Sequence, residues 1–229
     1  MWLTSSSIGR KVVMSVSGLG LVLFLTFHMA MNVVYIFSEE GYNMVCEFLG
    51  TNWYALAGTA ALAFLFLVHI VYAFWLTYQN RRARGSERYA ISGKQKIEWE
   101  SKNMLVLGII VICGLLTHLF NFWYNMMFAE LAGIETAIPP THGSEYINVT
   151  LTNPVYIVIY VIWLLAIWYH LNHGFWSALQ TIGWNGDTWM KRWQLIGKVW
   201  TTLVCLGFLA VIIAAVAKHG LSCGCCCAA

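Results

Sequence analysis

Residues 153–181 read NPVYIVIYVIWLLAIWYHLNHGFWSALQT and contain no aspartate, glutamate, lysine or arginine. The stretch is longer than the roughly 20 apolar residues that a helix needs to cross the hydrocarbon core of a bilayer. Its apolar character is continuous, whereas a strand of a membrane barrel would alternate over about 10 residues. It therefore predicts a transmembrane α-helix.

Uncharged apolar stretches recur along the whole chain, which excludes a single-pass protein. Of the 229 residues, 59% are apolar and only 10% are charged, whereas soluble domains have about 25% charged residues. The first stretch is too long for the apolar part of a cleaved signal peptide. We therefore expect an all-α membrane protein, a single domain with five transmembrane helices. The predicted spans are residues 12–37, 52–79, 103–128, 153–181 and 199–217.

The basic residues predict the orientation of these helices. If five helices alternate in direction, twelve of the thirteen lysines and arginines fall on one side of the membrane. The positive-inside rule assigns that side to the cytoplasm, which places the N-terminus inside and the C-terminus outside. A net charge of +3 without a basic stripe does not indicate binding to nucleic acid. Lys218 is the exception, and the twelve are Arg10, Lys11, Arg81, Arg82, Arg84, Arg88, Lys94, Lys96, Lys102, Lys191, Arg192 and Lys198.

Four of the five predicted spans carry a histidine at membrane depth: His28, His69, His118 and His170, with His173 three residues after the last. Ionisable residues inside transmembrane spans are uncommon and usually functional. A single such histidine is as easily a neutral hydrogen-bonding partner for a neighbouring helix. One histidine on each of four successive helices instead favours a shared role.

Depth in the membrane sorts these histidines into two levels. At about 1.5 Å per residue, His28 and His118 lie at similar distances from the outer ends of their spans. His69 and His170 lie at similar distances from the inner ends. Two imidazoles can hold one haem iron from opposite faces, so two levels of two predict two haems b stacked across the membrane. Zinc is the competing metal, but it usually recruits cysteine or carboxylate as well.

An internal repeat distinguishes His170 from His173. His69 opens the segment HIVYAFWLTYQ and His170 opens HLNHGFWSALQ, with the histidine, Phe-Trp and glutamine at the same spacing. His173 matches Tyr72, so the repeat favours His170 as the ligand and leaves His173 to contact a neighbour or a haem edge. Four small residues leave room for flat macrocycles or simply permit close helix packing: Ala30, Ala73, Gly114 and Gly174.

The chain resembles the cytochrome b subunit of succinate dehydrogenase and fumarate reductase (complex II). It is most similar to the single-chain, five-helix, two-haem form of the Bacteroidetes-type branch. The resemblance rests on Ser-Ser-Ile-Gly-Arg-Lys at 6–11, Ser-Val-Ser-Gly at 15–18 and His-x-x-His-Gly-Phe-x-Ser-Ala-x-Gln at 170–180. It covers the chain from about Ser5 to Lys218.

The resemblance implies that His28 and His118 hold an outer haem and that His69 and His170 hold an inner haem. It also implies two soluble partners on the cytoplasmic face of a bacterial inner membrane, a flavoprotein with FAD and an iron–sulfur subunit. The chain itself has no Gly-rich dinucleotide fold and no cysteine spacing for a cluster. The basic inner loops would be the docking face, although membrane topology and contact with lipid headgroups also explain their charge.

Further site residues follow from the resemblance as expectations. The substrate would be menaquinone or menaquinol, reached near the outer haem. Glu39 is the carboxylate best placed to exchange a proton with it, although it also fits a solvated loop acid. The quinone-site candidates are Asn32, Glu39, Glu47, Asn121 and Trp123. The candidates for contacts with the inner haem are Ser15, Ser17, Trp99, Lys102 and His173.

The chain departs from the family at one position and has one unexplained segment. Some relatives carry a glutamate, implicated in proton movement, where this chain has Trp168, so that pathway is not expected here. The Cys-rich tail at 221–229 is expected to be disordered, although clustered cysteines also bind metals or form disulfides.

Two other functions compete with the complex II reading. One is the di-haem anchor of another respiratory enzyme, such as a nitrate reductase, formate dehydrogenase or hydrogenase. One histidine on each of the first four helices favours complex II over that alternative. The other is a haem-free channel or transporter, which would need a polar path that the spans do not offer. Fumarate reduction by menaquinol is the favoured direction. The resemblance is also compatible with a higher oligomer of the heterotrimer.

Overall fold

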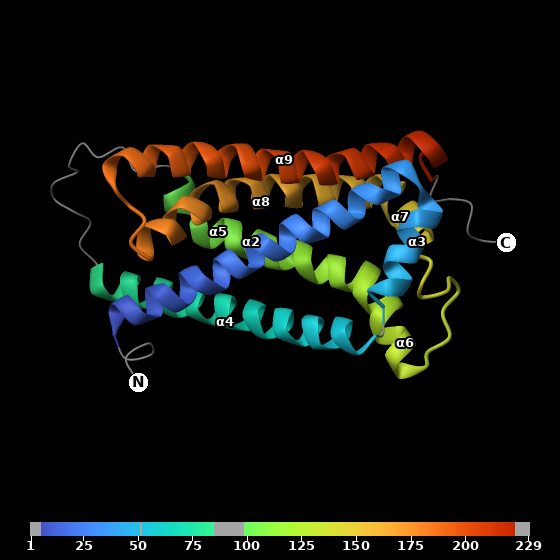
Figure 1. Cartoon of the computed structure of the whole chain (residues 1–229), viewed down its shortest axis with the longest axis horizontal. Coiled ribbons are helices and arrows are strands. Elements are labelled where there is room, and N and C mark those ends of the chain that lie inside the picture. Colours follow the sequence, from blue (N-terminus) through green and yellow to red (C-terminus); the bar gives the residue numbers. More distant parts are fainter. Residues whose placement is uncertain (1–5, 51, 85–98, 223–229) are drawn as a thin grey trace.

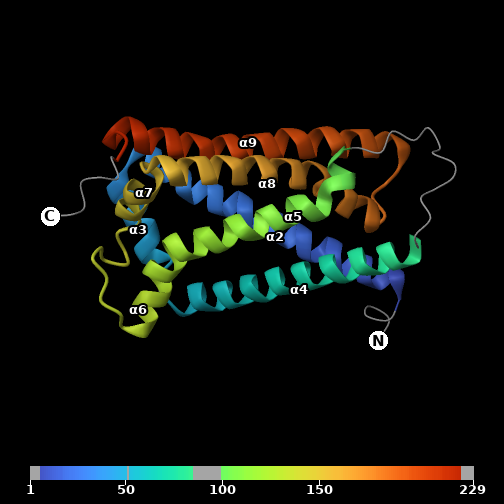
Figure 2. The same ribbon diagram turned by 180° about the vertical axis from the view of Figure 1, so that it is seen from behind.

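The computed structural model describes residues 6–50, 52–84 and 99–222, and all regular structure in these ranges is helical (Figure 1). Five helical runs are long and apolar enough to cross a membrane. They form an elongated bundle that the chain traverses five times (Figures 1 and 2). The runs are α2 (Ser7–Phe37), α4 (Trp53–Arg84), Trp99–Ala132, α8 (Pro154–Thr181) and α9 (Asp187–His219).

The long helices extend beyond their apolar stretches because local capping, rather than hydropathy, determines where they begin. The Ser6 Oγ accepts a hydrogen bond from the Gly9 amide at 2.9 Å and caps α2. The Asn153 side chain caps α8 in the same way, and Pro154 occupies the first turn. Helix α9 begins at Asp187, well before the apolar stretch at residue 199. Its first turns are polar and aromatic, and no side chain caps it.

Two short helices fold over the outer end of the bundle, where the sequence suggested only loops. They are α3 (Glu39–Phe48) and α7 (Gly143–Leu151). The chain breaks between α2 and α3 at Ser38, which is extended and whose side chain accepts a hydrogen bond from the Gly41 amide at 2.9 Å. The third long run is itself composite, with α5 (Trp99–His118), the π-helix η1 (Leu119–Phe128) and α6 (Ala129–Ala132).

The five long helices are packed unequally. Helix α8 contacts α9, α5 and α2, and α2 also contacts α9 and α4. Helix α4 packs on α2 and only lightly on α5, and it lies along one edge of the bundle in both views (Figures 1 and 2). None of its described residues is buried. The protein therefore holds α4 mainly through one neighbour.

The buried core is concentrated at the outer end, where α2, α3, α7, α8 and α9 meet. Tyr35 and Ala215 are fully buried there, and Ile147 is almost so. Large apolar side chains elsewhere point outward along the helices, as at Leu23 and Phe64, which are 72% and 67% exposed. A water-soluble protein does not expose apolar surface over its whole length. The chain is thus a multi-pass membrane protein.

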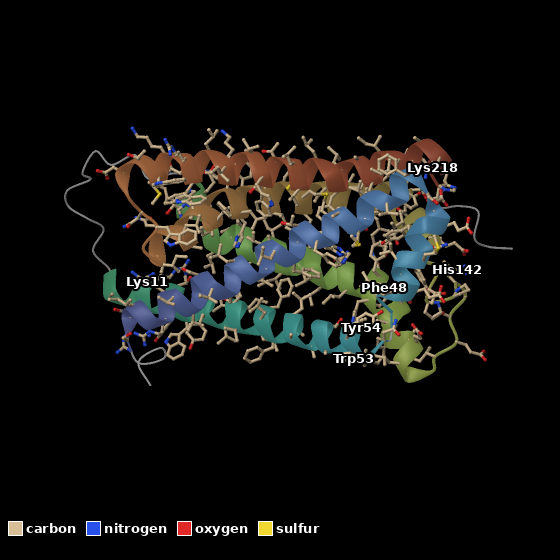
Figure 3. All side chains as sticks on the ribbon, in the orientation of Figure 1. Lys11, Phe48, Trp53, Tyr54, His142 and Lys218 are labelled. Carbon is tan, nitrogen blue, oxygen red and sulfur yellow. The ribbon has the colours of Figure 1, made fainter. Side chains whose placement is uncertain are left out.

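The two ends of the bundle differ in charge. Lys11 lies at one end, with the start of α2, and Lys218 and His142 lie at the other (Figure 3). The described basic residues of the predicted inner loops share the Lys11 end, because the five helices alternate in direction as expected. Arg88, Lys94 and Lys96 lie outside the described residues, as do positions 223–229 of the Cys-rich tail. We refer to the Lys11 end as the inner end and the Lys218 end as the outer end.

Candidate functional site

The outer pair of histidines joins α2 to α5. The imidazole rings of His28 and His118 face each other with centroids 5.7 Å apart and planes at 83°. Aromatic side chains surround both rings: Phe24 stacks on His28 at 5.4 Å, and Trp163 lies 5.5 Å from His118. Phe208 also approaches His28 from α9. The pair therefore occupies a largely apolar environment.

The inner pair joins α4 to α8. The rings of His69 and His170 have centroids 6.4 Å apart and planes at 67°. The Oγ of Ser17, from α2, lies 3.3 Å from Nδ1 of His69 and donates to the Met14 carbonyl at 3.0 Å. Ser17 thus gives one ring nitrogen of His69 a polar contact from α2.

The positions of two glycines show how far apart the two histidine pairs lie along the bundle. A Cβ on Gly18 would lie 3.2 Å from Cε1 of His69, and one on Gly108 would lie 3.9 Å from Cε1 of His170. Gly18 precedes His28 by ten residues on α2, and Gly108 precedes His118 by ten residues on α5. At about 1.5 Å per residue, both helices place the two pairs about 15 Å apart along the bundle. The two levels expected from membrane depth are therefore present as two facing pairs.

The donor set of each pair fits a group that needs only two protein ligands. No cluster of three or more His, Cys, Asp or Glu side chains occurs within residues 6–50, 52–84 and 99–222. Structural zinc requires about four ligands from protein and catalytic zinc about three, whereas a low-spin haem iron needs two axial ligands. Nδ1 of His118 and Nδ1 of His170 are also buried without a hydrogen-bond partner in those ranges. One imidazole in each pair thus has unsatisfied polar capacity.

The small residues near these depths have different roles. Gly114 serves close packing, because the Trp163 ring of α8 lies directly on it and the Trp163 Nε1 donates to the Val111 carbonyl at 2.9 Å. A Cβ on Gly174, by contrast, would meet nothing within 4 Å among the described residues. The space beside Gly174 is therefore open, whereas the Trp163 ring fills the space beside Gly114.

Two of the quinone-site candidates lie beside the outer histidine pair. Asn32 donates to the His28 carbonyl at 2.8 Å and accepts from the Tyr42 hydroxyl at 3.2 Å. Asn121 is buried and donates to the Tyr160 hydroxyl at 3.4 Å. Tyr160 in turn contacts His118, with ring centroids 6.3 Å apart. The structure thus brings Asn32 and Asn121 to the same level as the outer pair.

Glu39 belongs to a separate polar cluster that ties the end of α9 to α2, α3 and α7. Its carboxylate lies 3.0 Å from Nε2 of His219 and 3.6 Å from Nζ of Lys218, and it accepts from Asn148 at 3.3 Å. Lys218 also donates to the Tyr35 carbonyl at 2.9 Å. Burial would raise the pKa of Glu39, but the hydrogen bonds from His219 and Asn148 and the charges of His219 and Lys218 hold it below the ordinary 4.5. Glu39 is therefore a paired and ionised carboxylate rather than a free loop acid.

The remaining outer candidates, Glu47 and Trp123, are exposed. Trp123 is 38% exposed and contacts Phe128 at 5.6 Å. Glu47 lies near the C-terminal end of α3, whereas Glu39 is the first residue of that helix. The structure therefore does not gather all five outer candidates into one site.

The inner candidates are also divided. Ser15 and Ser17 are buried on α2, whereas Lys102 and Trp99 are exposed at the start of α5, with Trp99 5.3 Å from Tyr169. His173 contacts Trp176 edge-on at 4.8 Å. The matching residues of the internal repeat, Tyr72 and Trp75, also contact each other, at 5.8 Å but with their planes tilted at 41°. The repeat thus extends to side-chain contacts, and His173 occupies the place of a tyrosine.

Trp168 makes a hydrogen bond to a neutral partner. Its Nε1 donates to Oγ1 of Thr202 on α9 at 3.0 Å, and Thr202 donates to the Lys198 carbonyl at 2.7 Å. This bond links α8 to α9.

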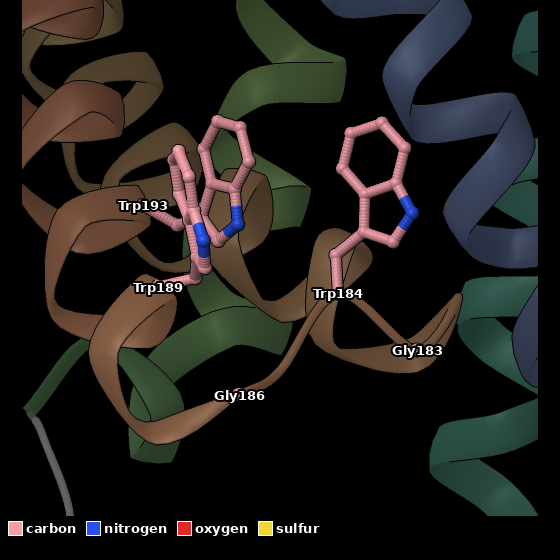
Figure 4. A pocket seen from close by; sticks show the side chains of 5 residues that line it. All are labelled: Gly183, Trp184, Gly186, Trp189 and Trp193. Atoms are coloured by element: carbon pink, nitrogen blue, oxygen red, sulfur yellow. The ribbon is translucent and has the colours of Figure 1, made fainter.

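Two features near the pairs were not expected from the sequence. The first is the π-helix η1, which begins immediately after His118; such wide turns are frequent at functional sites. The second is a cavity of about 420 Å³ at the inner end, lined by Trp184, Trp189 and Trp193 (Figure 4). Arg192 covers Trp189 at 5.0 Å. Clustered tryptophans beside basic residues are typical of a membrane interface, and the run of tryptophans in the sequence could have indicated this feature.

No protein-family model, no curated protein and no solved structure matches this chain.

Proposed function

We propose that this chain is the di-haem b membrane anchor of a succinate dehydrogenase or fumarate reductase. It would pass electrons between an iron–sulfur subunit at the inner end and menaquinone at the outer end. The observation that carries the proposal is the arrangement of four histidines, one on each of four helices, as two facing pairs about 15 Å apart along the bundle. Two relay points across a membrane are what an electron path through this chain requires.

The four histidines would hold the two groups. His28 and His118 would ligate the outer haem, and His69 and His170 the inner haem. Haem b supplies one-electron redox chemistry through its iron, and the protein sets the potential through ligands, burial and hydrogen bonds. Ser17 would orient His69 by its contact with Nδ1.

The aromatic side chains around the outer pair would exclude water from it. Phe24, Phe208 and Trp163 contribute most of this shell. Asn32 and Asn121 are the polar groups that reach the same level, so they are the residues proposed to hydrogen-bond the quinone. Glu39 would exchange protons with the outer aqueous phase through His219, to which it is bonded.

The inner end is proposed to face the bacterial cytoplasm and to bind the flavoprotein and iron–sulfur subunits. The asymmetry of basic residues supports this orientation. Lys102, Lys191 and Lys198 are exposed there and would meet the partner or the lipid headgroups.

The first test is the amount of haem b per mole of this chain, measured by pyridine haemochrome on the purified complex. We expect two. One haem would restrict the relay to one pair, and none in protein purified without haem loss would refute the proposal.

The second test separates the pairs. His69→Ala and His170→Ala should each remove the inner haem and leave the outer haem spectrum in place. His173→Ala is the matched control, because it removes an imidazole three residues from His170 and should retain both haems. Retention of both haems in His170→Ala, with loss of one in His173→Ala, would assign the ligand to His173 instead.

The third test identifies the enzyme. The purified complex should contain a subunit with bound flavin and should reduce fumarate with menaquinol. A di-haem complex whose partner lacks flavin and acts on nitrate, formate or hydrogen would favour the other respiratory anchors.

A further inference from the structure

Arg10 occupies the inner end of the seam between α2 and α4. It lies about two helical turns inward of Ser17 on α2, and its guanidinium carbon is 5.5 Å from the centroid of the Trp75 ring on α4. The side chain is half-buried. Arg10 thus reaches across the seam to the Trp75 ring.

The buried part of Arg10 lacks a partner. Its Nε is inaccessible and donates to no acceptor within the described ranges of the chain. Glu39 and Glu145, which form ion pairs, lie at the outer end of the bundle. Because a guanidinium is permanently charged, a buried donor of this kind favours an oxyanion ligand.

The location of Arg10 relates it to the inner histidine pair. Ser17, which contacts His69, follows Arg10 by seven residues, and Trp75 follows His69 by six. Both helices therefore place the guanidinium about 10 Å inward of the pair, along the same seam. A carboxylate that extends inward from a group held by the pair would approach Nε of Arg10.

We propose that Arg10 is an oxyanion-binding residue and that its ligand is a propionate carboxylate of the inner haem. The inference rests on the proposed function, because that group is what His69 and His170 would hold. The planar guanidinium fork matches a carboxylate through two parallel hydrogen bonds. The phosphate of a lipid headgroup has the same chemistry, and the experiment distinguishes the two sources.

The test compares redox titrations of the purified complex carrying Arg10→Gln, Arg10→Lys or Lys11→Gln. Lys11 is the matched control because it is the adjacent cation and is exposed. Arg10→Gln should retain two haems and lower the midpoint potential of the inner haem alone, since loss of a nearby positive charge favours the ferric state. Lys11→Gln should leave both midpoints unchanged.

Resonance Raman spectra supply a readout that does not depend on the potential. The propionate bending band of the inner haem should shift in Arg10→Lys, which keeps the charge but loses the planar fork. This variant also gives the answer if Arg10→Gln does not accumulate. An unchanged band in Arg10→Lys, or an unchanged inner midpoint in Arg10→Gln, would overturn the inference while two haems in the wild type uphold the proposed function.

The lipid alternative has its own outcome. Each titration is repeated in neutral detergent and in vesicles that contain phosphatidylglycerol. A shift of the inner midpoint in both media supports the propionate. A shift only in the anionic vesicles would assign Arg10 to a lipid phosphate and overturn the carboxylate assignment.

Discussion

Individual side chains at the outer end show how charge is used to hold the bundle together. Lys218 is the one basic residue expected outside, and it contacts the Glu39 carboxylate and the Tyr35 ring, 4.7 Å away. The Tyr35 hydroxyl donates to the Asn148 side chain at 2.5 Å, and Asn148 donates to Glu39. Lys218, Tyr35 and Asn148 thus form a ring of contacts that begins and ends at Glu39.

Glu39→Gln should lower the thermal midpoint at pH 7. The free energy of unfolding should fall by no more than about 1 kcal/mol, as is usual for a partly exposed ion pair. The lowered pKa of Glu39 means that the folded protein favours its carboxylate form. This stabilisation is present at pH values above the ordinary pKa of 4.5. It is lost as the pH falls through the lower pKa that Glu39 has in the folded protein. The difference between wild type and variant should therefore shrink below pH 4.5 in thermal unfolding scans.

Glu40→Gln is the control for that comparison, because Glu40 is the adjacent carboxylate and is exposed. Its thermal midpoint should equal that of the wild type both at pH 7 and below pH 4.5. Equal midpoints for wild type and Glu39→Gln at pH 7 would show that the cluster does not stabilise the fold.

The sequence indicated which histidines lie together better than it indicated their surroundings. The histidines could be paired because helical rise converts position into depth, and no partner from a distant helix had to be known. The Glu39 cluster could not be predicted, because Asn148, Lys218 and His219 come from segments more than 100 residues away. Arg10 was assigned to membrane topology and to the docking face. Its contact with Trp75 and its unpaired Nε appear only in the folded structure.

At the scale of helices, the contact between α5 and α8 depends on one glycine. The Trp163 ring lies directly on Gly114, is held by the Val111 carbonyl and contacts His118. Gly114 therefore connects the packing of two helices to the position of one proposed ligand.

Gly114→Ala should destabilise the protein by about 1–3 kcal/mol, because the added methyl group must displace a ring that fills its place. That cost exceeds the gain of about 1 kcal/mol expected from helix propensity. Gly58→Ala on α4 is the control, since its Cβ would meet nothing within 4 Å among the described residues. Thermal unfolding should rank Gly58→Ala above wild type and Gly114→Ala below it. The reverse order would mean that Trp163 moves aside at little cost.

The π-helix η1 is an element that could not be predicted from the sequence. The apolar stretch at 103–128 was correctly assigned to the membrane, but its last ten residues form η1 rather than an α-helix. Hydropathy does not distinguish the two, because both present apolar side chains to lipid.

At the scale of the whole molecule, the contact between α4 and α8 is formed by the inner histidine pair. Helix α4 otherwise rests on α2 and lightly on α5. The proposed inner haem would therefore fasten α4 as well as carry electrons.

His170→Ala should loosen α4 without unfolding the other helices. Spin labels at Phe64 on α4 and Leu203 on α9, in a background without native cysteines, should give one narrow distance distribution in the wild type. The distribution should broaden in His170→Ala, and labels at Val158 on α8 and Leu203 should be unaffected. All three residues are exposed. An equally narrow α4–α9 distribution in the variant would show that α2 alone fixes α4.

The packing of α4 also bears on how the chain is made. The ribosome delivers α2 and α4 to the membrane before α5, α8 and α9 exist, so during synthesis α4 has only α2 to pack against, as it mainly does in the finished protein. The later helices pack as a second group, α5 on α8 and α8 on α9. Each histidine pair takes one member from the early hairpin and one from the late group. Half of each proposed ligand set is therefore already in the membrane while the rest of the polypeptide is still being translated.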